Sequence, residues 1–388
     1  MKIKELFKNL ALLLITIIIF MILFEIALRF FYPQNLSRTQ LDKHLLFSNR
    51  ADLDNVHYNR WNEFNQYIST NSRGLRDYEY SYEKINNSFR ILMLGDSFVE
   101  GVEVAAENTT SKLLEKQLNQ LENGIHYDVI NFGVGGYGTS QELAYLERDG
   151  IKYSPDVVVL HIFPKNDLLD NIQKDVYLPF NYSTNYPTVS NTLINKEIQF
   201  TLFQRFWAFA IAHTHTANLI GIALLSNQNI AAILHRVDML KTHQFNATNV
   251  SYTRDIYLND PPQQIIDVFG KTKIYLDRMN ELAKQYNFTF IIVVIPAKEQ
   301  VDIDAYKQFI EKEELNESAV AMLAPNYVLQ QYAQQNEVIV IDPITLFREK
   351  NKQQKLYFVI DGHYKEQGHA LLADVLYERL INNEIITK

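Results

Sequence analysis

Ser97 ends a short apolar segment in a way that could present its hydroxyl for chemistry. Residues 89–101 read FRILMLGDSFVEG, and the apolar run stops at Gly95-Asp96-Ser97. A buried strand followed directly by a helix would place this serine at the carboxyl end of a sheet, where the sites of open α/β sheets lie. A serine hydroxyl becomes a nucleophile only beside a general base and donors that stabilise an oxyanion. The structural alternative is a helix cap, because Asp and Ser are favoured there.

Two further segments could supply the oxyanion donors. Residues 131–138 read NFGVGGYG, and glycines let backbone N–H groups approach a ligand closely. Because neither the G-x-G-x-x-G spacing nor a P-loop lysine is present, an oxyanion hole is favoured over phosphate binding. The second segment, residues 163–167, reads FPKND and offers the side-chain amide of Asn166.

An aspartate and a histidine near the C-terminus could activate the serine. Asp361-Gly362-His363 precedes a helix-like segment at the end of the chain. A neutral imidazole can take the proton of an attacking serine, and a carboxylate can orient the ring and stabilise the imidazolium. The chain therefore offers a nucleophile, two oxyanion donors and an Asp/His pair.

Alternating strand-like and helix-like segments are expected to position these residues. The strand candidates are short and continuously apolar, as strands buried on both faces are. They are residues 90–94, 127–131, 156–163, 288–295 and 337–341. The helix candidates are residues 110–121, 141–147, 265–285, 319–335 and 367–381. This alternation predicts an α/β fold with a flavodoxin-like, doubly wound parallel sheet of about five strands.

In order, these blocks resemble the Ser, Gly, Asn and His blocks of the SGNH (GDSL-like) hydrolase superfamily. The chain looks most like its membrane-anchored bacterial members, over most of residues 68–170 and 286–382. Residues 71–77, NSRGLRD, are similar to a segment that precedes the Ser block in such members. The resemblance implies a Ser97 nucleophile, a His363 base and Asp361 as its orienting acid. It further implies an oxyanion hole formed by Ser97, Gly136 and Asn166.

Two blocks depart from the usual SGNH pattern. The last block is usually Asp-x-x-His, whereas Asp361 and His363 are two apart and Ile360 stands at the usual Asp position. The shorter spacing also occurs in acyltransferase-like relatives. The third block lacks its usual glycine, so that Lys165 lies beside the predicted oxyanion hole. We expect Lys165 to be solvated, the alternative being that it binds an anionic substrate group.

Other polar residues are expected to be structural. We expect His369 to pack or cap within the closing helix and His161 to be a satisfied core histidine. His213 and His215 should lie on different faces of a helix, which argues against a shared metal. Asp96 and Asp167 are expected to make local backbone hydrogen bonds at their turns.

The N-terminus indicates a membrane anchor. Lys2, Lys4 and Lys8 precede an unbroken apolar run over residues 10–24, and Glu25 and Arg29 are spaced to pair. Bulky residues and no small-residue cleavage site follow, so we expect an uncleaved signal anchor rather than a cleaved signal. The lysines place the N-terminus in the cytoplasm. The chain would then contact the plasma (inner) membrane through residues 10–32 as a single-pass protein, with the rest periplasmic or extracellular.

The 388-residue chain is expected to divide into three parts. Residues 1–32 form the anchor, 33–88 a membrane-proximal extension packed on the core, and 89–388 the SGNH hydrolase-like domain. That domain contains an insertion at 171–262, within which an apolar helical stretch over 202–211 is expected to add to the core. The alternatives for this stretch are a cap over an acyl or glycan pocket and a surface near the bilayer.

Composition bounds the function. The chain has 47% hydrophobic residues, a net charge of −8 and no cysteines. The acidic balance argues against nucleic acid, and the lack of cysteine excludes thiolate nucleophiles and disulfides. No cofactor is implied, since no metal-ligand or nucleotide spacing is present.

These features predict a membrane-anchored serine esterase that acts outside the cytoplasm. Its expected substrate is an acylated envelope glycan or lipid, with acetyl as the expected acyl group. One alternative is an O-acyltransferase that passes the acyl group to a glycan. The other is a non-catalytic protein that binds glycan or scaffolds a partner.

Overall fold

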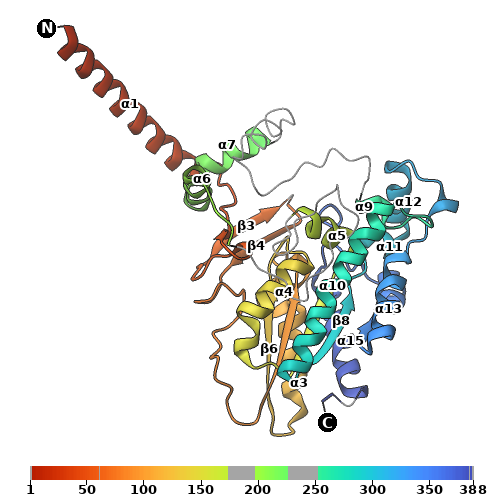
Figure 1. Cartoon of the computed structure of the whole chain (residues 1–388). Helices are drawn as coiled ribbons and strands as arrows, with labels where there is room; N and C mark the ends of the chain where they lie inside the picture. Colours follow the sequence, from red (N-terminus) through yellow and green to blue (C-terminus); the bar gives the residue numbers. More distant parts are fainter. Residues whose placement is uncertain (1, 61, 174–196, 226–251, 384, 387–388) are drawn as a thin grey trace.

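A five-stranded parallel sheet forms the centre of the protein (Figure 1). The computed structural model describes residues 2–60, 62–173, 197–225, 252–383 and 385–386. The strands lie in the order β6-β5-β7-β8-β9, the flavodoxin-like order. Their bounds are Ser88–Gly95 (β5), His126–Gly133 (β6), Val157–Ile162 (β7), Thr289–Val294 (β8) and Ile339–Ile341 (β9). The predicted fold class and all five predicted strands are therefore confirmed.

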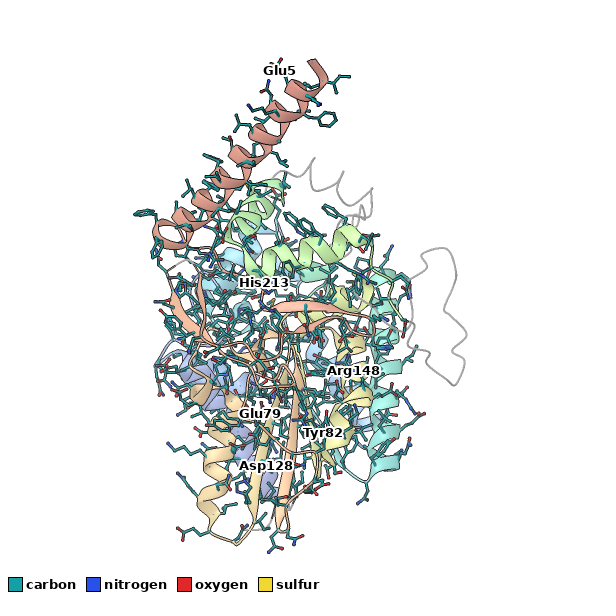
Figure 2. All side chains as sticks on the ribbon, turned by 90° about the vertical axis from the view of Figure 1, so that its left-hand side faces the viewer. Glu5, Glu79, Tyr82, Asp128, Arg148 and His213 are labelled. Atoms are coloured by element: carbon teal, nitrogen blue, oxygen red, sulfur yellow. The ribbon has the colours of Figure 1, made fainter. Side chains whose placement is uncertain are left out.

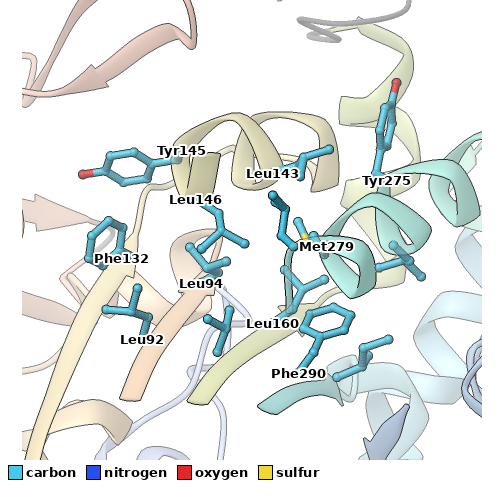
Figure 3. Packing of buried hydrophobic residues seen from close by; sticks show 14 of the residues in the cluster. Leu92, Leu94, Phe132, Leu143, Tyr145, Leu146, Leu160, Tyr275, Met279 and Phe290 are labelled. Carbon is cyan, nitrogen blue, oxygen red and sulfur yellow. The ribbon is translucent and has the colours of Figure 1, made fainter. Parts of the chain in front are cut away.

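Helices cover both faces of this sheet. One face carries α4 (Thr139–Arg148), α10 (Gln263–Tyr286) and α13 (Ala324–Asn336). The other carries α3 (Thr110–Leu118), α14 (Ile344–Asn351) and α15 (Glu366–Asn382). Because side chains of a strand alternate between faces, β5 sends Leu92 and Leu94 into the first core and Ile91 and Met93 into the second. Figure 3 shows the first core packed between the strands, α4 and α10.

One predicted helix starts later than expected. Residues 319–335 were expected to be helical, but α13 begins at Ala324. Pro325 lies in its first turn, where the fixed φ of proline suits helix initiation and its missing N–H costs nothing. The preceding Glu317–Ala319 form a separate 3₁₀ turn.

Two β-hairpins make up most of the extension between the N-terminal helix and the sheet. They pair β1 (Thr39–Asp42) with β2 (Leu46–Asn49) and β3 (Val56–Arg60) with β4 (Phe64–Ile68). Leu45 and Leu75 from this extension are buried in the first core. Residues 71–74 form a turn, closed by the Gly74 N–H donating to the Asn71 carbonyl. The extension is thus packed on the core, as expected.

The described part of the insertion is helical, and it contradicts one prediction. It contains the end of α5 (Pro164–Gln173), then α6 (Leu202–His213), α7 (His215–Leu225) and α9 (Tyr252–Asp255). The stretch expected to add to the core is α6, yet Leu202, Phe206 and Phe209 are 85%, 66% and 63% exposed. This helix turns these three side chains away from the protein, so the extra-core prediction is wrong.

The N-terminal helix α1 (Lys2–Phe31) projects away from the sheet (Figure 1). Its segment Ile3–Phe31 is long and apolar enough to cross a membrane. The remaining short helices are α2 (Ser97–Glu100), α11 (Lys298–Val301) and α12 (Ile303–Lys312).

Candidate active site

Ser97 is the first residue of α2, directly after β5. The Asp96 carboxylate caps this short helix by accepting the Phe98 N–H at 2.9 Å, which confirms the expected turn hydrogen bond. Gly95 is required before it, because a Cβ there would lie 2.4 Å from a methyl group of Val99. The tight turn between strand and helix holds the serine at the carboxyl edge of the sheet.

His363 lies within hydrogen-bond reach of the serine. Its Nε2 is 2.7 Å from Ser97 Oγ, and its Nδ1 is hydrogen-bonded to Asp361 Oδ1. The two-residue spacing permits this contact because Gly362 adopts φ +83°, a left-handed conformation that folds the chain back between the two side chains. Burial acts to raise the pKa of Asp361, but the hydrogen bond and charge of His363 hold it below the usual value.

The predicted oxyanion donors lie on the same cavity as the serine. Ser97, Gly136, Asn166 and His363 all line a cavity of about 700 Å³. The Asn166 amide donates to the Asp96 carboxylate at 3.1 Å, which fixes the orientation of this side chain. Gly136 adopts φ +81°, so that the glycine-rich turn bends around the end of β6.

The Ser, Gly, Asn and His blocks therefore meet at one edge of a doubly wound sheet. They follow β5, β6 and β7 and precede α15. The chain has the SGNH hydrolase fold.

No protein-family model matches the chain, and no curated protein does. It is similar to the solved structure of the acetyl xylan esterase AlAXEase, with 14% identity, 76% of this chain and 100% of that chain covered, and a TM-score of 0.40. A lipolytic protein of the G-D-S-L family from Veillonella parvula DSM 2008 has 14% identity, coverage of 75% and 97%, and a TM-score of 0.37. Esterase EstA from Pseudoalteromonas sp. has 11% identity, coverage of 78% and 100%, and a TM-score of 0.38. At these identities the chemistry of this chain has to rest on its own residues.

Glu103 is a second carboxylate beside the histidine, and the sequence did not reveal it. Its Oε1 lies 3.5 Å from His363 Nδ1, and its side chain is 2% exposed. Its Oε2 has no hydrogen-bond partner among the described residues. Burial raises the pKa of Glu103, although the positive charge of a protonated His363 opposes this shift.

The two carboxylates control the proton affinity of the histidine. Burial lowers the pKa of His363, but Glu103 and Asp361 outweigh this effect and raise it to about 9. A general base has to be neutral to accept a proton, so His363 would be able to act as a base only above neutral pH.

Glu103, Asp361 and His363 also offer three potential metal-ligand atoms within 4.8 Å of one another. Both imidazole nitrogens, however, already contact Ser97 and Asp361. A cation bound through Nδ1 would displace the hydrogen bond to Asp361.

The β3–β4 hairpin holds the loop that carries Asp361. The Glu63 carboxylate accepts the backbone N–H groups of Val359, Ile360 and Asp361 at 2.7–3.0 Å. Arg60 Nη1 lies 3.3 Å from Asp361 Oδ2. No motif marks these residues, because their role depends on an extension folding against a loop about 300 residues later in the chain.

The segment that precedes the Ser block fixes the chain after the serine. The buried Arg76 donates to the carbonyl oxygens of Glu100, Gly101 and Val104 at 3.0, 2.8 and 2.7 Å. This loop leads to Glu103. Residues 71–77 thus have a physical role in shaping the SGNH site, which their sequence similarity did not explain.

Lys165 differs from its prediction. It is not free in solvent, because its Nζ lies 2.6 Å from Glu299 Oε1, and that glutamate is buried. Both residues line the cavity, and their ion pair joins α5 to α11.

His213 and His215 were expected on different faces of one helix, but they lie in separate helices, since α6 ends at His213 and α7 begins at His215. The other predicted structural residues behave largely as expected. His369 is buried, and its Nδ1 lies 3.0 Å from Thr110 Oγ1 at the start of α3. His161 is buried with Nδ1 3.2 Å from the Leu94 carbonyl, but its Nε2 has no partner among the described residues. Asp167 accepts the Phe163 N–H at 2.8 Å.

Proposed function

We propose that this protein is a membrane-anchored serine esterase that acts outside the cytoplasm on an acyl ester, acetyl by preference, of an envelope glycan or lipid. The observation that carries the proposal is the hydrogen-bonded series from Ser97 through His363 to Asp361, which opens on a cavity. This is the arrangement that acyl transfer through a covalent serine intermediate requires.

The proposed reaction has two halves. His363 Nε2 takes the proton of Ser97 as Oγ bonds to the ester carbonyl carbon, and the imidazolium then returns this proton to the departing alcohol. In the second half, His363 deprotonates a water molecule that attacks the acyl-serine, and the acid leaves as Ser97 recovers its proton. The backbone N–H groups of Ser97 and Gly136 and the Asn166 amide are proposed to stabilise the oxyanion of each tetrahedral intermediate.

The cavity suits a substrate that has an apolar acyl group on a polar carrier. Its volume of about 700 Å³ lies within the usual range for small-molecule sites. Near the serine it is lined by Phe98, Phe163 and Ile360, which suit the apolar part of an acyl group. Further away, α11 and α12 contribute charged residues, including Lys298 and Lys312, which suit a hydroxyl-rich or anionic carrier.

The contacts of α1 support an anchor that stays on the mature protein. Leu28 is 7% exposed, and Glu25 and Arg29 both bond to the α6–α7 segment. The Glu25–Arg29 pair expected from the sequence is present at 2.9 Å. A cleaved signal peptide would take these contacts away from the folded domain.

Hydrolysis of nitrophenyl acetate by the full chain in detergent tests the proposal. Wild-type protein should release nitrophenol, and Ser97→Ala should reduce release to the uncatalysed rate. Ser88→Ala is the matched control, because Ser88 begins the same strand β5 at the opposite edge of the sheet. Equal activity of Ser97→Ala and wild type would overturn the proposal.

The same assay separates hydrolysis from transfer. With a glycan acceptor present, free acetate alone indicates an esterase, and an acetylated glycan indicates an acyltransferase. The Asp361–His363 spacing, which also occurs in acyltransferase-like relatives, motivates this second function. The geometry of the site serves water and sugar hydroxyls equally.

A further inference from the structure

We propose that α6 and α7 form a helical hairpin that lies in the outer leaflet of the bilayer, with lipid acyl chains as its partner. This inference rests on the proposed membrane anchor α1. It concerns a surface that the proposed catalysis does not use, since neither helix lines the cavity.

Helix α6 has its polarity reversed relative to an ordinary surface helix. Its buried residues are Gln204 and Ala212, whereas Leu202, Phe206 and Phe209 are 85%, 66% and 63% exposed. These three lie at positions i, i+4 and i+7, so they form one stripe. A surface helix normally turns such a stripe toward the core. An aromatic stripe directed outward fits the apolar face of a helix at a membrane interface.

Helix α7 continues this apolar surface. Its residues His215–Leu224 form a short apolar helix, in which Ile220 and Ile222 are 44% and 60% exposed. The two helices pack closely, because a Cβ on Gly221 would lie 3.3 Å from the Trp207 ring. At this length α7 is too short to span a bilayer, and it suits a helix that lies within one leaflet.

The corner between α6 and α7 is bonded to the end of α1. Glu25 accepts the N–H groups of His215 and Thr216 at 3.0 and 2.9 Å, so its carboxylate caps the start of α7. Arg29 donates to the His213 carbonyl at 3.2 Å at the end of α6. Figures 1 and 2 both place the hairpin at the base of α1, and Figure 2 labels His213 there.

The position of these bonds along α1 indicates that lipid is the partner of the hairpin. Glu25 and Arg29 follow the unbroken apolar run of α1, so they mark the level at which an anchored α1 leaves the hydrocarbon. The hairpin is fixed at that level. Its exposed apolar stripe then meets the lipid, and Arg205, also exposed, can extend its charge to the headgroups.

The native tryptophans provide the test. The chain contains Trp61 and Trp207, and only Trp207 lies in the hairpin. The full-length Trp61→Phe variant would be reconstituted into phosphatidylcholine–phosphatidylglycerol vesicles with acyl chains brominated either near the headgroup or near the chain end. We expect loss of Trp207 emission, stronger with the shallow bromines, because interfacial helices bury their apolar face by about 5–10 Å.

The matched control is Trp207→Phe, in which only Trp61 remains. Its chain neighbours Arg60 and Glu63 contact Asp361, so bromolipid should leave the emission unchanged. Phe206→Ser/Phe209→Ser in the Trp61→Phe background should weaken quenching while the vesicles still carry the protein on flotation. If the protein floats with the vesicles but bromolipid does not quench Trp207, the hairpin proposal is overturned and the proposed anchor is retained. This conclusion holds whether the ring is open to acrylamide, a water-soluble quencher, or shielded by protein. Failure to float would overturn both.

Discussion

His363 lies between two carboxylates, and this placement should be visible in the pH dependence of the reaction. Because the pKa of His363 is raised to about 9, the imidazole is protonated at neutral pH and becomes a competent base only as the pH rises. We expect kcat/KM for nitrophenyl acetate to increase with pH through this region. Glu103→Gln removes the larger raising charge and should shift the acidic limb of the profile to lower pH.

Glu107→Gln is the control for this experiment, since Glu107 is an exposed acid four residues further along the same loop. It should leave the profile in place. If the acidic limb of the pH profile of kcat/KM is the same in Glu103→Gln as in wild type, Glu103 carries no charge in the resting site.

Asn166 is the proposed oxyanion donor whose removal is easiest to interpret. Its amide is oriented by Asp96, so Asn166→Ala should remove one donor and leave the cap of α2 intact. We expect kcat to fall by roughly 100- to 1,000-fold. Steady-state kinetics combined with a thermal unfolding curve would check this, and a loss explained by unfolding alone would contradict the assignment.

Sequence reasoning located Ser97, Asn166 and His363 because each lies next to the end of a strand or the start of a helix. It did not find Glu103, because a lone glutamate in a loop carries no pattern. The approach of Glu103 to the imidazole depends on Arg76 holding that loop. The glycine between Asp361 and His363 was visible, but its left-handed conformation, which makes the short spacing workable, was not.

The β3–β4 hairpin acts as a clamp on the loop that carries Asp361, the proposed orienting acid. Glu63→Gln replaces a carboxylate that receives three backbone N–H groups, so the loop at Asp361 should loosen. Small displacements of reacting groups cost on the order of 100-fold in rate, and we expect kcat to fall within that bound.

Glu79→Gln provides the comparison, because Glu79 also accepts a backbone N–H within the extension but lies outside the β3–β4 hairpin. It should leave kcat unchanged. Equal kcat in wild type and Glu63→Gln would show that the loop holds its shape without the clamp.

The sheet was predictable because continuous runs of Val, Ile and Leu have few alternatives to a buried parallel strand. The outcome for α6 was not, because an apolar helix fits a core and a membrane equally well by composition. Only the exposure of Phe206 and Phe209 separates these two environments.

Helix α1 is bonded to the rest of the folded protein through Glu25 and Arg29. Glu25→Ala would leave the first N–H groups of α7 without their carboxylate, and we expect a loss of about 1 kcal/mol in unfolding free energy. Thermal unfolding of the full chain in detergent would measure it. Glu5→Ala, an exposed acid at the far end of the same helix, should have no effect. If Glu25→Ala and Glu5→Ala have the same unfolding free energy, the α6–α7 hairpin and α1 are not coupled.

The proposed function depends on Ser97 being the nucleophile, and fluorophosphonate labelling tests this role most directly. The full chain should take up one label, mapped by mass spectrometry to Ser97. Ser97→Ala should remain unlabelled and His363→Ala should label far more slowly. An unlabelled wild-type protein, or a label on another residue, would contradict the assignment.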